Sequence, residues 1–201
     1  MKYIFQAFLI ICLISCQTNT DEKGMEHLIA QDELLYTKKY NSIEKAVENP
    51  DSVFQLDLSR RDLSILPTEL IDLPKLQVLM LDFNNLKTLN PRVLENLSLL
   101  QILFLEFNKI EQFPTEIGVL VHLKHLNIEG NPIDNLPESF FQLDSLEGIT
   151  AGYTNIPLST WKRLKTLHPD IEIRLDDGLK YDTTLTESNF QDRYEKEVMG
   201  L

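Results

Sequence analysis

The feature that most constrains the fold is a repeat of about 23 residues through the middle of the chain. Its units align at spacings of 23, 24, 23 and 23 residues, and they begin at Val53, Leu76, Leu100, Leu123 and Leu146. Each unit fits the pattern L-x-x-L-x-L-x-x-N-x-L, and apolar residues fill all 20 leucine positions of the five units together. A single unit of this length cannot bury its apolar side, whereas stacked units can. The sequence therefore predicts a solenoid of about five coils.

Each repeat divides into a strand half and a helical half. Apolar residues alternate in the first half, which indicates a short strand with one side turned inward. The second half carries a proline, which suits the first turn of a short helix or 3₁₀ segment, in the repeats where it begins at Leu66, Phe113 and Leu136. The second repeat is one residue longer, because Asn90 is inserted before Pro91.

These residues resemble the leucine-rich-repeat family in its short form, with L-P-x-x-L-x-x-L in the second half, over roughly residues 41–175. The resemblance implies an α/β solenoid shaped as a horseshoe, with parallel strands on the concave face and short helical or 3₁₀ segments on the convex face. The Asn position is filled by Asn84, Asn108 and Asn131, whose amides can satisfy backbone groups where the chain turns inside the stack. Arg61 and Thr154 replace it in the terminal repeats, which are often atypical because they meet a cap.

Helical caps are expected at both ends of the repeats, which span residues 53–156. Residues 41–52 are predicted to form the first cap, with Ser42 as N-cap residue and an apolar face toward the first repeat made by Ile43, Ala46 and Val47. Residues 157–176 are predicted to form the second, as a helix and a final strand, with one apolar helical face made by Leu158, Trp161, Leu164 and Leu167. Residues 177–201 are expected to be a polar, acidic tail.

The N-terminus has the features of an export signal. Lys2 and the apolar run of residues 7–14 form its n-region and h-region, and the run is shorter than the roughly 20 residues of a spanning helix. The run ends in Leu-Ile-Ser-Cys at residues 13–16, which resembles the cleavage box of bacterial lipoproteins. That resemblance implies a cleaved signal peptide at residues 1–15 and acylation of Cys16. Residues 16–40 then form a tether, helical over residues 26–36; the alternative is an ordinary signal peptide with a chance cysteine.

The same resemblance implies a place in the bacterial cell envelope. Gln17 follows the cysteine in place of the Asp that favours inner-membrane retention, so the outer membrane is favoured by analogy, with surface exposure left open. With Cys12 removed and Cys16 acylated, the mature chain has no thiol nucleophile, disulfide or thiolate metal site.

No arrangement of residues predicts catalysis, a metal or a cofactor. The chain has no phosphate-binding or metal-binding motif. His122 and His125 fall in different parts of one repeat, and Asp57, Ser59 and His125 are too far apart in the stack for one proton relay. Lys and Arg total 19 against 31 Asp and Glu, a formal charge of −12, which disfavours nucleic acid as a partner. The acidity fits either plain solubility or a basic partner.

The candidate ligand site follows from the resemblance, because outward-facing strand residues line the concave surface in that family. Here they include an apolar block made by Val78, Met80, Ile102 and Phe104, bordered by Phe83 and Phe107. Beside it lie His125, Asn127 and a column of carboxylates at Asp82, Glu106 and Glu129. The alternatives are aromatic rings that pack over the turns and a carboxylate column that is only solvated.

The sequence thus predicts a membrane-anchored module that binds a protein or peptide, with a basic one as an option. The alternative is a structural or adhesive surface protein that engages host or neighbouring-cell molecules through its convex loops or tail. Nothing in the sequence fixes the oligomeric state.

Overall fold

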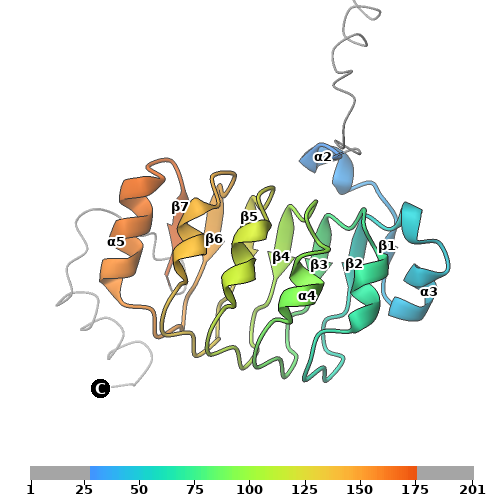
Figure 1. The fold of residues 1–201 in the computed structure, drawn as a ribbon, viewed down its shortest axis with the longest axis horizontal. Coiled ribbons are helices and arrows are strands. Elements are labelled where there is room, and N and C mark those ends of the chain that lie inside the picture. The colour runs from blue at the N-terminus through green and yellow to red at the C-terminus, as the bar shows by residue number, and fades with distance from the viewer. Residues whose placement is uncertain (1–27, 176–201) are drawn as a thin grey trace, which may run out of the picture.

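The computed structural model describes residues 28–175, which form one sheet of seven parallel strands in the order β1 to β7. The strands are short, and their bounds are β1 (Lys39–Tyr40), β2 (Gln55–Asp57), β3 (Val78–Met80), β4 (Ile102–Phe104), β5 (His125–Asn127), β6 (Gly148–Thr150) and β7 (Glu172–Arg174). Short helices lie along one face of the sheet, and each repeat contributes one strand and one helical segment (Figure 1). The predicted solenoid of stacked coils is confirmed.

The core is a continuous row of apolar side chains at the middle of the strands. In register, the row runs through Tyr40, Leu56, Leu79, Leu103, Leu126, Ile149 and Ile173. Every member is buried, because alternation along each strand turns this residue toward the helical layer. The row adds β1 and β7 to the five strands of the repeats, so both caps extend the same sheet.

The helical halves differ between the repeats. Three of them are 3₁₀ helices, namely η2 (Thr68–Asp72), η3 (Thr115–Val119) and η4 (Glu138–Gln142). The longer second repeat instead forms a turn of α-helix, α4 (Pro91–Leu94). The inserted Asn90 is its N-cap, and its side-chain oxygen accepts a hydrogen bond from the N–H of Arg92 at 3.0 Å. The extra residue therefore supplies a cap that the other repeats lack.

Buried asparagines satisfy the backbone where the coils turn. The Asn108 amide donates to the carbonyls of Leu81 and Leu105 at 2.9 and 3.0 Å, and its oxygen accepts from the N–H of Leu86 at 3.0 Å. Asn84 and Asn131 make the same kinds of bond in their own repeats. Each asparagine joins two coils, so the stack is held by polar as well as apolar contacts.

Both ends of the stack are closed by helices. At the N-terminal end, α3 (Ile43–Val47) buries Ala46, its N-cap Ser42 accepts from the N–H of Lys45, and the 3₁₀ helix η1 (Pro50–Ser52) follows. At the C-terminal end, α5 (Leu158–Leu167) buries an apolar face made by Leu158, Trp161 and Leu164. Leu167 was expected on this face, but it is 52% exposed. Steps of three residues fall short of a full turn, so Leu167 lies on the opposite side of α5 from Leu158.

Part of the segment expected to be a tether is folded against the repeats. Within it, α2 (Gln31–Leu34) and β1 are formed, and Leu34 is buried. The helix is shorter than the expected helix over residues 26–36, and Figure 1 shows it beyond the ends of the strands. We call residues 28–37 the strap. Its docking has a polar cause that apolar periodicity does not reveal, since glutamines from the repeats bind its backbone.

The predicted signal peptide, Cys16, the first part of the tether and the acidic tail lie outside the described residues. Between residues 28 and 175, no helix is long and apolar enough to cross a membrane.

Candidate binding cleft on the open face of the sheet

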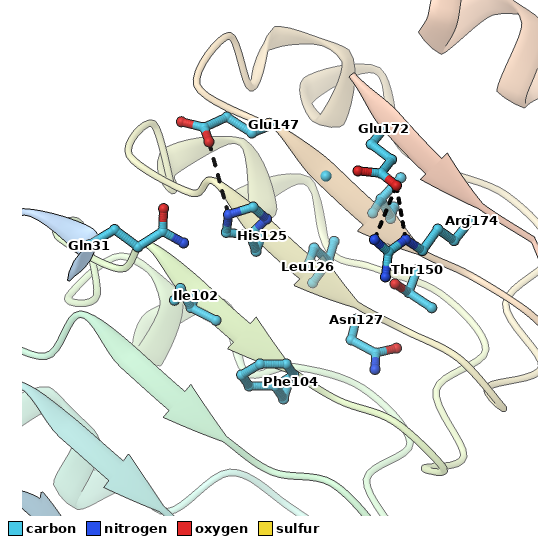
Figure 2. A pocket seen from close by; sticks show the side chains of 12 residues that line it. Gln31, Ile102, Phe104, His125, Leu126, Asn127, Glu147, Thr150, Glu172 and Arg174 are labelled. Atoms are coloured by element: carbon cyan, nitrogen blue, oxygen red, sulfur yellow. Dashed lines mark hydrogen bonds and ion pairs between the residues drawn. The ribbon is translucent and has the colours of Figure 1, made fainter. Parts of the chain in front are cut away.

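A cleft of about 500 Å³ lies on the face of the sheet that carries no helices. Strands β4 to β7 form it, and Figure 2 shows their side chains converging on it, with Gln31 of α2 at one end. Two register rows supply the lining, one through Ile102, His125, Gly148 and Glu172 and the other through Phe104, Asn127, Thr150 and Arg174. The cleft therefore follows directly from the alternation of the strands.

Small residues on β6 make this part of the face hollow. Gly148 lies between His125 and Glu172 in its row, and a Cβ at Gly148 would come within 3.1 Å of the His125 Nδ1 atom. Thr150 fills the next outward position with a short side chain. The larger side chains of β5 and β7 rise on either side, so the missing volume of β6 becomes the cleft.

The cleft combines an apolar side with polar walls. Ile102 and Phe104 of β4 are half-buried there. On the rim, Lys124 Nζ lies 3.2 Å from a Glu147 oxygen and His125 Nε2 lies 3.9 Å from the other, while Arg174 pairs with Glu172 at 3.1 Å. These pairs are partly exposed, so each adds little stability and a ligand can recruit its charges.

The predicted site residues are divided by this geometry. Four of them line the cleft, namely Ile102, Phe104, His125 and Asn127. Met80 is half-buried in the row between Asp57 and Phe104. Val78 differs from the expectation of an exposed side chain, because it is only 3% exposed. The apolar block is thus open at β4 and covered at the start of β3.

The carboxylate column lies beside the cleft, past the ends of β3 to β5. Asp82 Oδ1 accepts the N–H of Glu106 at 2.9 Å, and Glu106 Oε2 accepts from Asn127 Nδ2 at 3.1 Å. Burial, with the nearby charges of Glu106 and Asp57, raises the pKa of Asp82 to about 6 despite the backbone hydrogen bond. Glu129 continues the column, and its N–H donates to Asn127 Oδ1 at 3.0 Å.

Asp57, in the neighbouring row with Met80 and Phe104, shows the opposite behaviour. Burial raises the pKa of its carboxyl group, but hydrogen bonds from Ser59 and Lys39 outweigh burial and hold the pKa below its ordinary value. Lys39 Nζ lies 3.2 Å from Asp57 Oδ2. The cap strand β1 therefore neutralises Asp57, whereas Asp82 has no such cation among the causes of its shift.

Phe83 and Phe107 form an exposed ridge outside the cleft. Their rings stack with centroids 5.1 Å apart, and the guanidinium of Arg60 lies 4.1 Å from the Phe83 centroid. All three residues have positive φ, which bulky side chains rarely adopt. The next repeat has Gly130 at this position, and a Cβ there would lie 2.5 Å from the Phe107 ring. The rings thus pack over the turns while remaining 39% and 43% exposed.

The sequence reasoning did not select several lining residues, which are Gln31, Glu147, Gly148, Thr150, Glu172 and Arg174. For β6 the signal was present, because Gly148 and Thr150 occupy outward positions of the last repeat. For β7 it was also present, since Ile171, Ile173 and Leu175 alternate and leave Glu172 and Arg174 outward. Gln31 had no signal, because its place depends on how the strap docks.

Within residues 28–175, no three His, Cys, Asp or Glu side chains are placed to hold a metal ion. The residues that line the cleft offer a ligand apolar surface, hydrogen-bonding groups and charges.

Comparison with known proteins connects this architecture to a family. Models described as leucine rich repeat match residues 52–110 and 122–143. A search of curated proteins gives no significant match to the chain.

Two solved structures illustrate the likeness in fold. A leucine-rich-repeat protein of Leptospira interrogans has a TM-score of 0.51 and 24% identity, over 68% of this chain and 46% of that one. A complex of TLR13 with ssRNA13 has a TM-score of 0.56 and 23% identity, over 69% of this chain and 20% of that one. The present chain thus spans less than half of either structure, and at these identities the likeness shows the fold alone.

Proposed function

Because this chain is a leucine-rich-repeat protein, we propose that it binds an extended segment of another protein in the cleft over β4 to β7. Proteins with this fold typically act as interaction modules and not as enzymes. The observation that carries the proposal is the cleft itself, which joins the apolar side chains of Ile102 and Phe104 to polar walls on the uncovered face.

The size of the cleft favours a segment over a globular surface. Standard protein interfaces bury about 800 Å² on each partner. Seven strands of two or three residues expose a smaller area than this on the open face of the sheet. Ligand pockets of about 300–1,000 Å³ take small molecules or a few residues, and about 500 Å³ lies within that range.

Charge favours a basic residue beside an apolar one in that segment. If an apolar side chain of the bound segment packs on Phe104, the next residues of that segment lie near Glu106, which is two residues further along this chain. Asp82 accepts a hydrogen bond from the N–H of Glu106. Burial raises the pKa of Asp82 and the charge of Glu106 adds to the rise, so a cation reaching this pair would stabilise both carboxylates. The acidic column also makes a phosphate backbone an unfavourable ligand.

Site-specific crosslinking tests the location of the site. A photo-crosslinking amino acid at Thr150 lies in the cleft, whereas the same amino acid at the exposed Val121 lies in the turn after η3, away from it. We expect a partner from cell envelopes to be captured through Thr150 and not through Val121. Capture through Val121 alone would instead support adhesion through the convex side.

Binding of the identified partner by purified variants then tests the chemistry. Phe104→Asp places a charge on the apolar side of the cleft, and Val121→Asp makes the same kind of change at an exposed position outside it. We expect Phe104→Asp to weaken binding at least tenfold and Val121→Asp to leave it unchanged. Equal affinities of the two folded variants would contradict the proposal.

The proposal includes anchoring of the module to a membrane through Cys16, in the cell envelope and with the outer membrane favoured. Its support is the sequence, in which an apolar run ends in Leu-Ile-Ser-Cys. Two or more acyl chains would hold the protein firmly, at about 0.8 kcal/mol per buried methylene. Labelling of cells with an alkyne-tagged palmitate should mark the wild-type protein and leave Cys16→Ser unmarked. Equal labelling of the two would refute acylation at Cys16.

A further inference from the structure

The strap is held by three buried glutamines from successive repeats. Gln77 Oε1 accepts the N–H of Ile29 at 2.9 Å, and Gln101 Nε2 donates to the carbonyl of the same residue at 2.8 Å. The two amides also bond each other at 2.8 Å. Gln55 donates to the carbonyls of Leu34 and Thr37 at the other end of the strap. Gln55, Gln77 and Gln101 are 7%, 0% and 3% exposed, so the strap covers them.

These contacts recognise a peptide backbone and not particular side chains. One amide accepts from the N–H of Ile29 and the next donates to its C=O, as a neighbouring strand would. The Ile29 side chain has no part in these two bonds. Any extended residue other than proline offers the same donor and acceptor, so the pair of glutamines is a site of low sequence specificity.

The strap fits this site only marginally. Its sole buried side chain is Leu34, whereas Leu28, Leu35 and Tyr36 are 40%, 78% and 90% exposed. Its helix α2 has four residues and no side-chain N-cap bond. Burial of one leucine and the glutamine bonds oppose the conformational entropy lost by about ten ordered residues, so we expect the strap to open while the rest stays folded.

We propose that Gln77 and Gln101 form a binding site for the backbone of an extended peptide, and that the strap fills this site in cis. A peptide from a partner then displaces the strap and takes its place beside the open face. The strap adjoins the cleft, where Gln31 forms one wall, and Val78, the residue after Gln77, is buried. This inference rests on the proposed function only for the idea that partners approach this face.

A peptide in trans tests the site directly. The probe is a fluorescently labelled peptide with the sequence of residues 28–37, titrated into the purified full-length protein by fluorescence anisotropy. In the wild type the strap competes at the high effective concentration of a linked segment, so the peptide binds weakly. Leu34→Asp would bury a carboxylate, which releases the strap and makes the place of Ile29 accessible to the peptide.

Leu35→Asp is the matched control, because it adds the same charge at the C-cap of α2, where the side chain is 78% exposed. We expect the peptide to bind Leu34→Asp at least tenfold more tightly than the wild type or Leu35→Asp, since apparent affinity scales with the open fraction. Adding Gln77→Leu and Gln101→Leu to Leu34→Asp should remove this gain.

Two results would overturn the inference. One is a folded Leu34→Asp protein whose affinity for the peptide equals that of the wild type. The other comes from hydrogen exchange of the wild type and does not depend on any variant. We expect the amides of Ile29 and Leu34 to exchange at least tenfold faster than those of β3 and β4, and equal protection would show that the strap opens only with the whole fold. Neither measurement involves the cleft partner, so the proposed function can fail separately.

Discussion

Asp82 should make the protein less stable as the pH rises. Its pKa is raised from 3.8 to about 6 by burial, with smaller contributions from the charges of Glu106 and Asp57. Between these two values the folded state holds a proton that the unfolded state releases, so stability must fall with rising pH. The contribution of the protonated carboxyl group is fully present below pH 3.8 and is lost as the pH passes through about 6.

The magnitude follows from the size of the pKa change. A rise from 3.8 to about 6 corresponds to about 3 kcal/mol, at 1.36 kcal/mol per pKa unit. The Asp82 side chain is only half-buried, and solvent screens its interactions with Glu106 and Asp57. We therefore expect about 1 kcal/mol of unfolding free energy to be lost between pH 4 and pH 7.5 through this group.

Asp82→Asn isolates the contribution of the Asp82 charge to the unfolding free energy, because an amide oxygen can still accept the N–H of Glu106 while carrying no charge. Urea unfolding of wild type and variant at pH 4.5, 6 and 7.5 gives the two free energies. We expect similar stabilities at pH 4.5 and a variant about 1 kcal/mol more stable at pH 7.5. Asp72→Asn, at an exposed position in η2, controls for the loss of one negative charge. A difference between wild type and Asp82→Asn that stays constant with pH would refute the reasoning.

Three other substitutions test the fold and the cleft. Trp161→Ala should lower the unfolding free energy by about 3–5 kcal/mol in urea titrations, because the buried indole closes the last coil; a loss under 1 kcal/mol would mean that α5 does not seal the core. Asn108→Ala should cost about 3 kcal/mol, since one backbone N–H and two carbonyls lose their partner. A melting temperature of Asn108→Ala equal to that of the wild type would contradict this expected cost. Gly148→Ala should leave the stability within about 1 kcal/mol, because the exposed His125 ring can move, and should weaken partner binding; unchanged affinity would place the ligand elsewhere.

The repeat made most of the fold predictable. A fixed period sets one strand for each coil, and alternation within a strand decides which residue enters the interior row from Leu56 to Ile149. Even the departure in the second repeat was readable, since the inserted Asn90 becomes the cap of α4. Local chemistry and global packing agree at these positions, which is why sequence reasoning succeeds there.

The candidate site was less predictable, because it depends on contacts between distant parts of the chain. Strand alternation correctly identified the outward-facing residues but could not show which of them are buried. Val78 was therefore expected to be open, although it is only 3% exposed and lies beside Gln55 and Gln77, which bind the strap. The hollow at Gly148 likewise comes from three neighbouring strands together, and no single repeat reveals it.

If Cys16 is acylated as we propose, the position of the strap also affects how far the module reaches from a membrane. Cys16 precedes Ile29 by 13 residues, which span at most about 45 Å when extended. If Cys16 is acylated as we propose, the docked strap sets this limit from its contact with Gln77 and Gln101. Displacement of residues 28–37 would lengthen the tether by up to about 35 Å and uncover the open face in the same event. Binding and reach would then be coupled, which attachment directly at the first repeat could not provide.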